Sequence, residues 1–442
     1  MDEQEFFDQN PWWKDKSLIE KDYDIVKWNE KKYKWIPEII EKINLEPFSL
    51  HVLSGPRQAG KTTAVKLLIK KLLQEKEAKS IFFFSCEDVA DYKELLEILN
   101  FYIQFKEASS VKNSIIILDE ITSPHEWYRA VKSLIDKGKF RNDVIILTGS
   151  SSINVKKEVE LFPGRRGNGK DFVLYPLSFR SFLKVVDSDL VKKLDCFNTL
   201  DDIHKKVLNS LMFEKELNKY LEKYMEFGGF PLSVANLDGS KEEAIKVYLS
   251  WIKNAILKAD RSDIIARQII KVIIETLQSS ISWETISKKI EIKSPKTAFA
   301  YVDLLKSIFV LNVLYNIDLS GKKMRFGKNK KIHLRDPLLI DTFEEWCLIK
   351  SQNKITAIAE SLVIEHLVRM FPEKVFFWKN GLEIDAVVLE KDKLYGFEVK
   401  WSEKINIKVP SQINNMITIT KKEYSKVPFK IPLSVFLSIF DV

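Results

Sequence analysis

The chain has 442 residues and a mass of 51.5 kDa. A domain takes roughly 100 to 200 residues, so this length favours about three domains over one. Hydrophobic residues make up 45% of the chain and charged residues 30%, with only 14 Gly and 14 Pro. This composition excludes a disordered or low-complexity chain and predicts a folded, soluble protein.

The cysteines and the N-terminus bear on the compartment. Cys86, Cys196 and Cys347 are far apart and form no CxxC pair, which excludes a disulfide framework and a cysteine-based zinc site. No apolar run reaches the roughly 18 residues of a membrane span, and the first residues, MDEQEFFDQNPWW, lack the basic and apolar order of a signal peptide. We expect a cytoplasmic protein with no membrane partner.

The charge balance is basic. Lys and Arg total 70 against 62 Asp and Glu, which gives a formal net charge of +8. A clustered surplus favours a polyanion such as DNA, whereas a dispersed surplus fits solvated lysine-rich helix faces. The charge alone does not choose between them.

A glycine-rich motif provides the strongest signal. It matches G-x-x-x-x-G-K-[ST] in full, and its residues are Gly55, Pro56, Arg57, Gln58, Ala59, Gly60, Lys61 and Thr62, followed by Thr63. Residues 49–53 read as a strand before it and residues 63–69 as a helix after it. The alternative is a tight strand-to-helix turn with an incidental lysine.

The motif has a direct physical interpretation. Glycines allow backbone N–H groups to form an anion nest, and the helix N-terminus adds partial positive charge. We expect Lys61 to contact the β and γ phosphates of ATP and the Thr62 hydroxyl to ligate Mg²⁺.

Two further apolar runs end in polar residues. Residues 115–118 precede Asp119, expected to hold Mg²⁺ through water, and Glu120, expected to polarise the attacking water; a solvated acidic turn is the alternative. Residues 144–147 precede Thr148 and Ser150, either of which is a candidate γ-phosphate sensor. An ordinary Gly/Ser turn explains that segment equally simply.

Two arginines follow in a Pro-Gly loop. Arg165 and Arg166 carry the guanidinium chemistry of an arginine finger, acting in cis or in trans, and surface charge is the alternative.

The motifs together resemble a known family. The set GPRQAGKTT, IIILDEI, ILTGSSS, PGRRG and YPLSF is similar to archaeal and bacterial predicted ATPases of the AAA+ superfamily, whose P-loop core has an additional catalytic glutamate. The resemblance implies an α/β fold with a parallel sheet over residues 1–180, and Mg²⁺-dependent ATP hydrolysis. It also implies that residues 10–13 belong to the nucleotide-base pocket.

The middle of the chain reads as helical. Residues 181–264 predict a charged helical lid that closes over the nucleotide. Residues 265–345 predict a winged helix, with helices at 267–278, 283–290 and 296–305 and wing strands at 310–315 and 330–334. Candidate phosphate contacts are Lys293, Lys296, Lys322, Lys323 and Arg325. The same fold also serves as a packing module.

Residues 346–442 carry a second constellation. A helix over 356–371 contains Glu360, and three strand-like segments follow at 375–378, 382–388 and 395–401. Glu398 and Lys400 are two residues apart and share one face of a strand, and Asp385 lies on a neighbouring strand.

This constellation resembles the PD-(D/E)xK nuclease superfamily. The resemblance implies that Asp385 and Glu398 bind Mg²⁺ or Mn²⁺, that Glu360 supports the metal or water, and that Lys400 orients the nucleophile. Ile384 stands where the superfamily motif has proline. The alternatives are an inactive relative that keeps the acids as an ion-paired cluster, or an unrelated hairpin.

The expected function is therefore ATP hydrolysis that drives a conformational change coupled to nucleic-acid binding or cleavage. One alternative is a nucleotide-dependent signalling switch that binds a protein partner and has an inactive nuclease-like domain. A small-substrate kinase is less favoured, because the second motif supplies a hydrolytic glutamate. The sequence leaves a homo-oligomer open.

Overall fold

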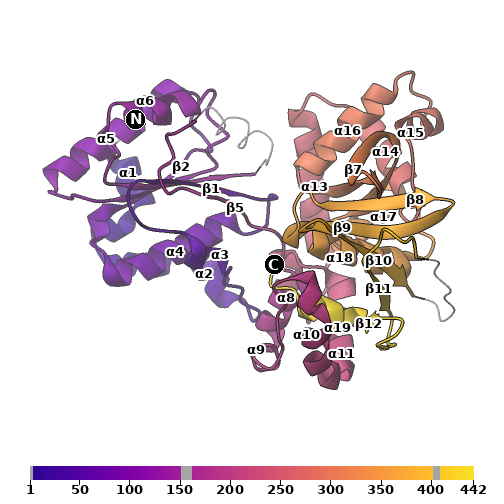
Figure 1. Cartoon of the computed structure of the whole chain (residues 1–442). Helices are drawn as coiled ribbons and strands as arrows, with labels where there is room; N and C mark the ends of the chain where they lie inside the picture. Colours follow the sequence, from indigo (N-terminus) through magenta and orange to yellow (C-terminus); the bar gives the residue numbers. More distant parts are fainter. Residues whose placement is uncertain (1–2, 151–161, 402–408) are drawn as a thin grey trace. The chain divides into compact units, whose positions relative to one another are not determined.

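The structure is a computed structural model that describes residues 3–150, 162–401 and 409–442. Ser151 and Ser152, at the end of the third motif, lie outside the described residues. The chain divides into two compact units, Met1–Tyr175 and Pro176–Val442, and each is considered by itself (Figure 1). No described helix combines the length and the apolar character that a membrane span requires.

A five-stranded parallel sheet forms the centre of the first unit and confirms the predicted α/β core. The strand order is β2-β3-β4-β1-β5. The strands are β1 (Ser49–Ser54), β2 (Ile81–Ser85), β3 (Ile115–Asp119), β4 (Val144–Gly149) and β5 (Asp171–Val173). Its helices are α1 (Glu3–Gln9), α2 (Tyr23–Glu30), α3 (Ile39–Lys42), α4 (Lys61–Glu75), α5 (Tyr92–Ala108) and α6 (Tyr128–Asp136).

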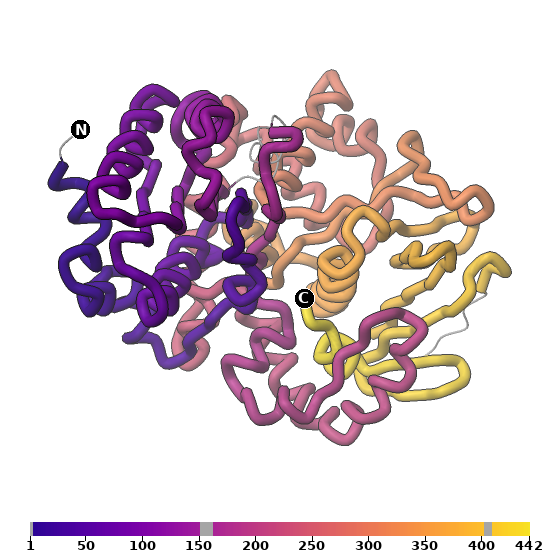
Figure 2. Tube along the Cα trace, turned by 60° about the vertical axis from the view of Figure 1, so that its left-hand side comes forward, coloured from indigo at the N-terminus to yellow at the C-terminus, as the bar shows by residue number. Residues whose placement is uncertain are grey.

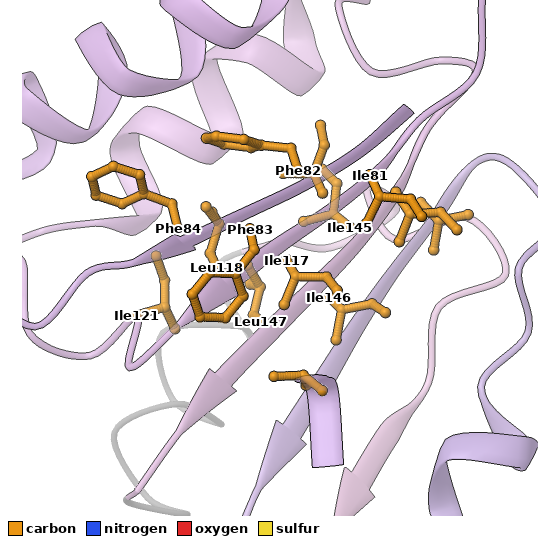
Figure 3. Close-up of a cluster of buried hydrophobic side chains, with 14 of the residues drawn as sticks. Ile81, Phe82, Phe83, Phe84, Ile117, Leu118, Ile121, Ile145, Ile146 and Leu147 are labelled. Carbon is orange, nitrogen blue, oxygen red and sulfur yellow. The ribbon is translucent and has the colours of Figure 1, made fainter. Parts of the chain in front are cut away.

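The central strands are apolar because helices cover both faces of the sheet. In Figure 1, α5 and α6 lie on one face and α4 lies on the other. Side chains of three neighbouring strands, including Phe83, Ile117 and Ile146, interlock in one buried cluster (Figure 3). A strand buried on both faces needs apolar side chains on both sides, which accounts for the continuous apolar runs in the sequence.

The N-terminal segment covers β2 at the outer edge of this sheet. This position corrects the expectation that residues 10–13 belong to the nucleotide-base pocket. The indole N–H groups of Trp12 and Trp13 donate to the carbonyl of Ile81 at 3.0 and 2.9 Å. The Asn10 amide donates to the carbonyl of Phe83 at 2.9 Å and accepts from its N–H at 2.7 Å. Since β3 and β4 separate β2 from the glycine loop after β1, these side chains do not form a nucleotide-base pocket. They protect an edge strand.

A mixed seven-stranded sheet forms the centre of the second unit, in the order β12-β11-β10-β9-β8-β6-β7. The strands are β6 (Leu311–Asp318), β7 (Lys323–Leu334), β8 (Val375–Asn380), β9 (Leu382–Glu390), β10 (Lys393–Lys400), β11 (Asn415–Thr420) and β12 (Lys430–Pro432). The predicted wing strands correspond to the antiparallel pair β6 and β7. This hairpin also joins the C-terminal strands, because β6 pairs with β8 at Asn316 and Phe377.

Helices account for most of the remaining second unit. They are α8 (Phe179–Val186), α9 (Ser188–Val191), α10 (Ile203–Ser210), α11 (Glu214–Phe227), α12 (Pro231–Ala235), α13 (Glu242–Lys258), α14 (Asp263–Glu275), α15 (Trp283–Lys289), α16 (Pro295–Ser307), α17 (Leu338–Cys347), α18 (Lys354–Met370) and α19 (Leu433–Ser438). Helix α18 packs against β7, β8, β9 and β10.

The segment predicted as a lid packs against the C-terminus of the chain. Figure 2 shows the yellow C-terminal segment beside the magenta helices, and α19 contacts both α8 and α11. The buried guanidinium of Arg180 donates to the carbonyl of Ser438 at 2.7 Å. Residues 181–264 are therefore built into the second unit, and a lid role remains a prediction.

The edge-covering contact of Asn10 is testable. Asn10→Ala leaves the N–H and carbonyl of Phe83 without their side-chain partner in a buried environment. We expect the free energy of unfolding of the first unit to fall by about 1–3 kcal/mol. Urea titration followed by tryptophan fluorescence measures this change, and Asn113→Ala at an exposed position is the control. Equal midpoints for the two variants would contradict the assigned role.

Candidate functional site

The glycine loop connects the carboxyl end of β1 to the first turn of α4. Gly60 has a φ of 89°, a left-handed conformation that glycine adopts without steric cost. No side chain caps α4, and its first turn contains no acidic residue. The N–H groups of this turn are thus available to an anion.

Lys61 is folded back onto the loop. Its amine donates to the carbonyls of Gly55 and Pro56, at 3.1 Å each, and lies 3.9 Å from Oε1 of Glu120. Burial lowers the pKa of Lys61, and the carboxylates of Glu120 and Asp119 act in the opposite direction. A phosphate in the loop would provide stronger, charge-assisted acceptors than the two carbonyls.

Asp119 is the meeting point of three elements. The Thr62 hydroxyl on α4 donates to Oδ2 of Asp119 at 2.7 Å. The Thr148 hydroxyl on β4 donates to Oδ1, and the Glu120 N–H donates to the Thr148 oxygen at 3.0 Å. The predicted residues Lys61, Thr62, Asp119, Glu120 and Thr148 are therefore brought together.

This donor set fits a magnesium ion. Thr62 and Asp119 offer a hydroxyl and a carboxylate oxygen, the hard ligands that Mg²⁺ prefers alongside water and phosphate. Their oxygens already lie 2.7 Å apart. A bound Mg²⁺ would offset negative charge on phosphate oxygens.

The other loop residues frame the site. Arg57 Nε lies 3.4 Å from the Ser150 hydroxyl and so links the loop to the end of β4. Gln58 is exposed, Ala59 is buried, and Thr63 is half-buried on the first turn of α4.

The two arginines lie elsewhere in the first unit. Arg165 pairs with Asp136, at the end of α6, at 2.6 Å. Arg166 pairs with Asp171 at 2.6 Å, and its guanidinium lies 3.4 Å from the carbonyl of Leu50. Leu50 is at the start of β1, whereas the glycine loop follows the end of that strand. Neither arginine reaches the loop of its own chain, so a finger role requires a second chain.

The C-terminal candidates converge in the second unit. The Asp385 N–H lies 3.3 Å from Glu398 Oε2, and the Val399 N–H donates to Asp385 Oδ2 at 2.8 Å. The Lys400 amine lies 2.5 Å from Glu398 Oε1. Glu360 faces the same cluster from α18.

Sequence reasoning missed two members of this cluster. The Lys331 amine, on β7, lies 2.8 Å from Glu360, 2.9 Å from Glu383 and 2.8 Å from Asp385. Alternation along β9 is the signal for Glu383, which shares a face with Asp385. No local signal identified Lys331, because it was assigned to a wing strand.

Burial and neighbouring charges together shift the pKa values of the side chains in this cluster. Burial, together with Asp385, raises the pKa of Glu360 to about 7. Burial and Asp385 also raise the pKa of Glu398. For Lys331, burial acts to lower the pKa, but Asp385, Glu360 and Glu383 outweigh it and raise the pKa above its ordinary value. Lys331 is therefore a firmly protonated cation.

The cluster does not fit the divalent ion that the nuclease resemblance implies. Within residues 3–150, 162–401 and 409–442, no three His, Cys, Asp or Glu side chains are arranged to hold a metal. The carboxylates of Glu360, Glu383 and Asp385 converge on one position, and the Lys331 ammonium occupies it.

Comparisons with known proteins agree with the first site. Residues 48–183 match the family described as "AAA domain", and residues 356–429 match a domain of unknown function, DUF4143. Over residues 48–183 the chain resembles P-loop ATPases of the AAA class. The DUF4143 match covers Glu360, Asp385, Glu398 and Lys400 and assigns no activity to them.

One relative spans most of the chain. It is an uncharacterized protein of Methanocaldococcus jannaschii, MJ1544, which is 27% identical over 376 residues, covering 82% of this chain and 77% of that protein. Among solved structures, the ORC2 protein of Aeropyrum pernix is 11% identical with a TM-score of 0.39, over 68% of this chain and 88% of that chain. RuvB of Thermotoga maritima is 14% identical with a TM-score of 0.26, over 62% and 84% of the two chains. TM-scores this low carry no functional implication.

Thr148 gives a sharp test of the first site. Thr148→Val keeps the side-chain volume but removes the hydroxyl that joins Asp119 to the Glu120 N–H. We expect the ATP hydrolysis rate to fall about 10- to 100-fold, since hydrogen bonds to charged groups contribute about 1.5–3 kcal/mol.

Steady-state phosphate release measures this rate, and Thr148→Ser, which retains the hydroxyl, should restore most of it. A wild-type rate in the valine variant would show that the Thr148 hydroxyl positions nothing that hydrolysis needs.

Proposed function

We propose that the first unit binds ATP with Mg²⁺ and hydrolyses it. The observation that carries this proposal is the 2.7 Å contact between the Thr62 hydroxyl and Asp119, beside the Lys61 amine and the uncapped start of α4. A phosphate-binding loop and an acid from another strand of the same sheet are the two parts that P-loop hydrolysis requires. The match of residues 48–183 to AAA domains supports it.

Each residue has a defined task in this proposal. Lys61 exchanges its two carbonyl contacts for oxygens of the β and γ phosphates. Thr62 and Asp119 hold the metal, which supplies positive charge at the phosphates. Glu120, about a fifth exposed and next to Lys61, accepts a proton from the attacking water. The Thr148 hydroxyl hydrogen-bonds to both the Asp119 carboxylate and the Glu120 N–H, and so fixes their relative positions.

Lys61→Ala is expected to abolish ATP hydrolysis, because it removes the cation that compensates charge on the transferred phosphate. The control is Lys71→Ala, a lysine on the same helix that is exposed and pairs with Glu41. Phosphate release and nucleotide affinity, measured on both variants, should separate them by at least about 100-fold in rate. Hydrolysis that persists in Lys61→Ala would refute the assigned site.

We further propose that the second unit couples this cycle to nucleic acid. Helices α14, α15 and α16 are followed by the hairpin of β6 and β7, and Ile281, before α15, forms a bridge with Lys330 of β7. This is the element order of a winged helix. Exposed cations lie on the hairpin and at or just before the start of α16: Lys293, Lys296, Lys322, Lys323, Arg325 and Lys328. Among them, Arg325 pairs with Asp318, and the Lys322 amine donates to the carbonyl of Asp392 at 2.6 Å.

Salt dependence tests the nucleic-acid proposal. Contact with phosphates releases counterions, so affinity for duplex DNA should fall steeply between about 50 and 200 mM salt. Replacing Lys322, Lys323 and Lys328 by Ala should reduce the slope of log affinity against log salt by up to about 3. Fluorescence anisotropy measures the slope, and alanine at the exposed Lys192, Lys193 and Lys215 is the matched control. DNA binding without salt dependence would contradict the proposal.

A second candidate is a nucleotide-dependent switch that binds a protein partner through an inactive nuclease-like domain. Lys331 specifically favours inactivity of that domain, because its ammonium pairs with Glu360 and Asp385, two of the acids that cleavage would use. Cleavage at Asp385, Glu398 and Lys400 is the competing possibility. Absence of salt-dependent DNA binding, with ATP hydrolysis intact, would favour the switch.

A further inference from the structure

We propose that Lys331 is a tethered cation that takes the place of a divalent metal in the carboxylate cluster, so that this site neither binds a metal nor cleaves phosphodiesters in this conformation. The proposal concerns residues of the second unit alone. It stands or falls independently of ATP hydrolysis at Lys61.

The first support is the matching of donors and acceptors. A lysine ammonium has three N–H donors and no acceptor. The Lys331 amine has three carboxylate partners, on Glu360, Glu383 and Asp385, at 2.8 to 2.9 Å. Its side chain is 0% exposed, so no water competes for these donors. Two of these contacts are hydrogen bonds, to Glu360 and Asp385, and the third is an ion pair with Glu383.

The second support is exclusion. A divalent ion needs oxygen ligands at about 2.0–2.6 Å. Glu360 and Asp385, two of the three predicted ligands, already point oxygens at the ammonium. A metal on the same oxygens would lie next to a buried positive charge, where low polarity strengthens the repulsion. Metal and ammonium therefore compete for one position.

The third support is the way in which Lys331 is anchored. It lies in the buried half of β7 and pairs in register with Leu314 of β6. The hairpin therefore fixes the position of the Lys331 backbone beside the three carboxylates. The other cations of the cluster reach only its rim, because Lys379 pairs with Glu383 and Lys400 with Glu398.

His333 shows what the cluster would offer without Lys331. It follows Lys331 by two residues on β7, is fully buried, and neither ring nitrogen has a hydrogen-bond partner. Its Nε2 lies 3.9 Å from Glu360 Oε1. Burial and the charge of Lys331 lower its pKa well below the ordinary value, so the imidazole is neutral. With the ammonium removed, this imidazole and the Glu360 carboxylate would be two donors of the types that Mn²⁺ accepts.

The test measures Mn²⁺ binding to the full chain, by electron paramagnetic resonance of the free ion. All proteins carry Asp119→Asn, which removes the carboxylate ligand of the metal proposed for the first unit. We expect no detectable Mn²⁺ binding by the protein that keeps Lys331. For Lys331→Met we expect measurable binding, with an affinity at least tenfold above the detection limit. Adding Asp385→Asn to Lys331→Met should abolish that binding. Lys379→Met, at a half-exposed lysine of the same cluster, should remain metal-free.

Two outcomes overturn the proposal. One is Mn²⁺ binding by the protein that keeps Lys331, if that binding disappears with Asp385→Asn. This measurement needs no substitution at Lys331, so it is decisive even if Lys331→Met fails to fold. The other is a Lys331→Met protein that unfolds cooperatively on heating and still binds no Mn²⁺. Phosphate release by the otherwise unaltered chain reports the first site separately.

Discussion

The carboxylate of Asp119 depends on hydroxyl groups from two other elements, and the first site is assembled around it. Thr62 lies in the first turn of α4, and Thr148 lies near the end of β4, the strand between β1 and β3. Thr148 reaches Asp119 because β4 lies between β1 and β3, two strands that precede it in the chain. Parallel strands that end at the same sheet edge bring the loop, the acid and the threonine to one position. Lys61 and Glu120 are adjacent in the chain to Thr62 and Asp119, so they are brought to the same position.

The two units use the same residue types to opposite effect. In the first unit, Lys61 contacts two neutral carbonyls and lies 3.9 Å from Glu120, so a phosphate provides better partners than those already present. In the second unit, Lys331 is enclosed by three carboxylates at 2.8 to 2.9 Å. A buried cation with three charged partners is costly to separate from them. The first arrangement can accept an anionic ligand, whereas the cation of the second already has anionic partners.

The edge of the first sheet shows how a segment outside the P-loop motifs supports it. Trp12, Trp13 and Asn10 cover β2 with hydrogen bonds to its backbone. An uncovered edge strand would expose unpaired N–H and carbonyl groups. The tryptophans that the family resemblance linked to the nucleotide base instead stabilise the sheet at β2, and two strands lie between β2 and the strand that carries the glycine loop.

The sequence by itself determined the glycine loop, the acids after residues 115–118, the parallel α/β core and the three acids Glu360, Asp385 and Glu398. These features are local: a motif, an apolar run or an alternating strand is written in consecutive residues. Tertiary structure decided what lay far apart in the chain. It placed Arg165 and Arg166 away from the loop, joined the predicted wing to the C-terminal sheet, and brought Lys331 to Glu360 and Asp385. Strand order and register fix these contacts, and neither can be read from residue spacing, because a pairing between distant strands leaves no periodic signal.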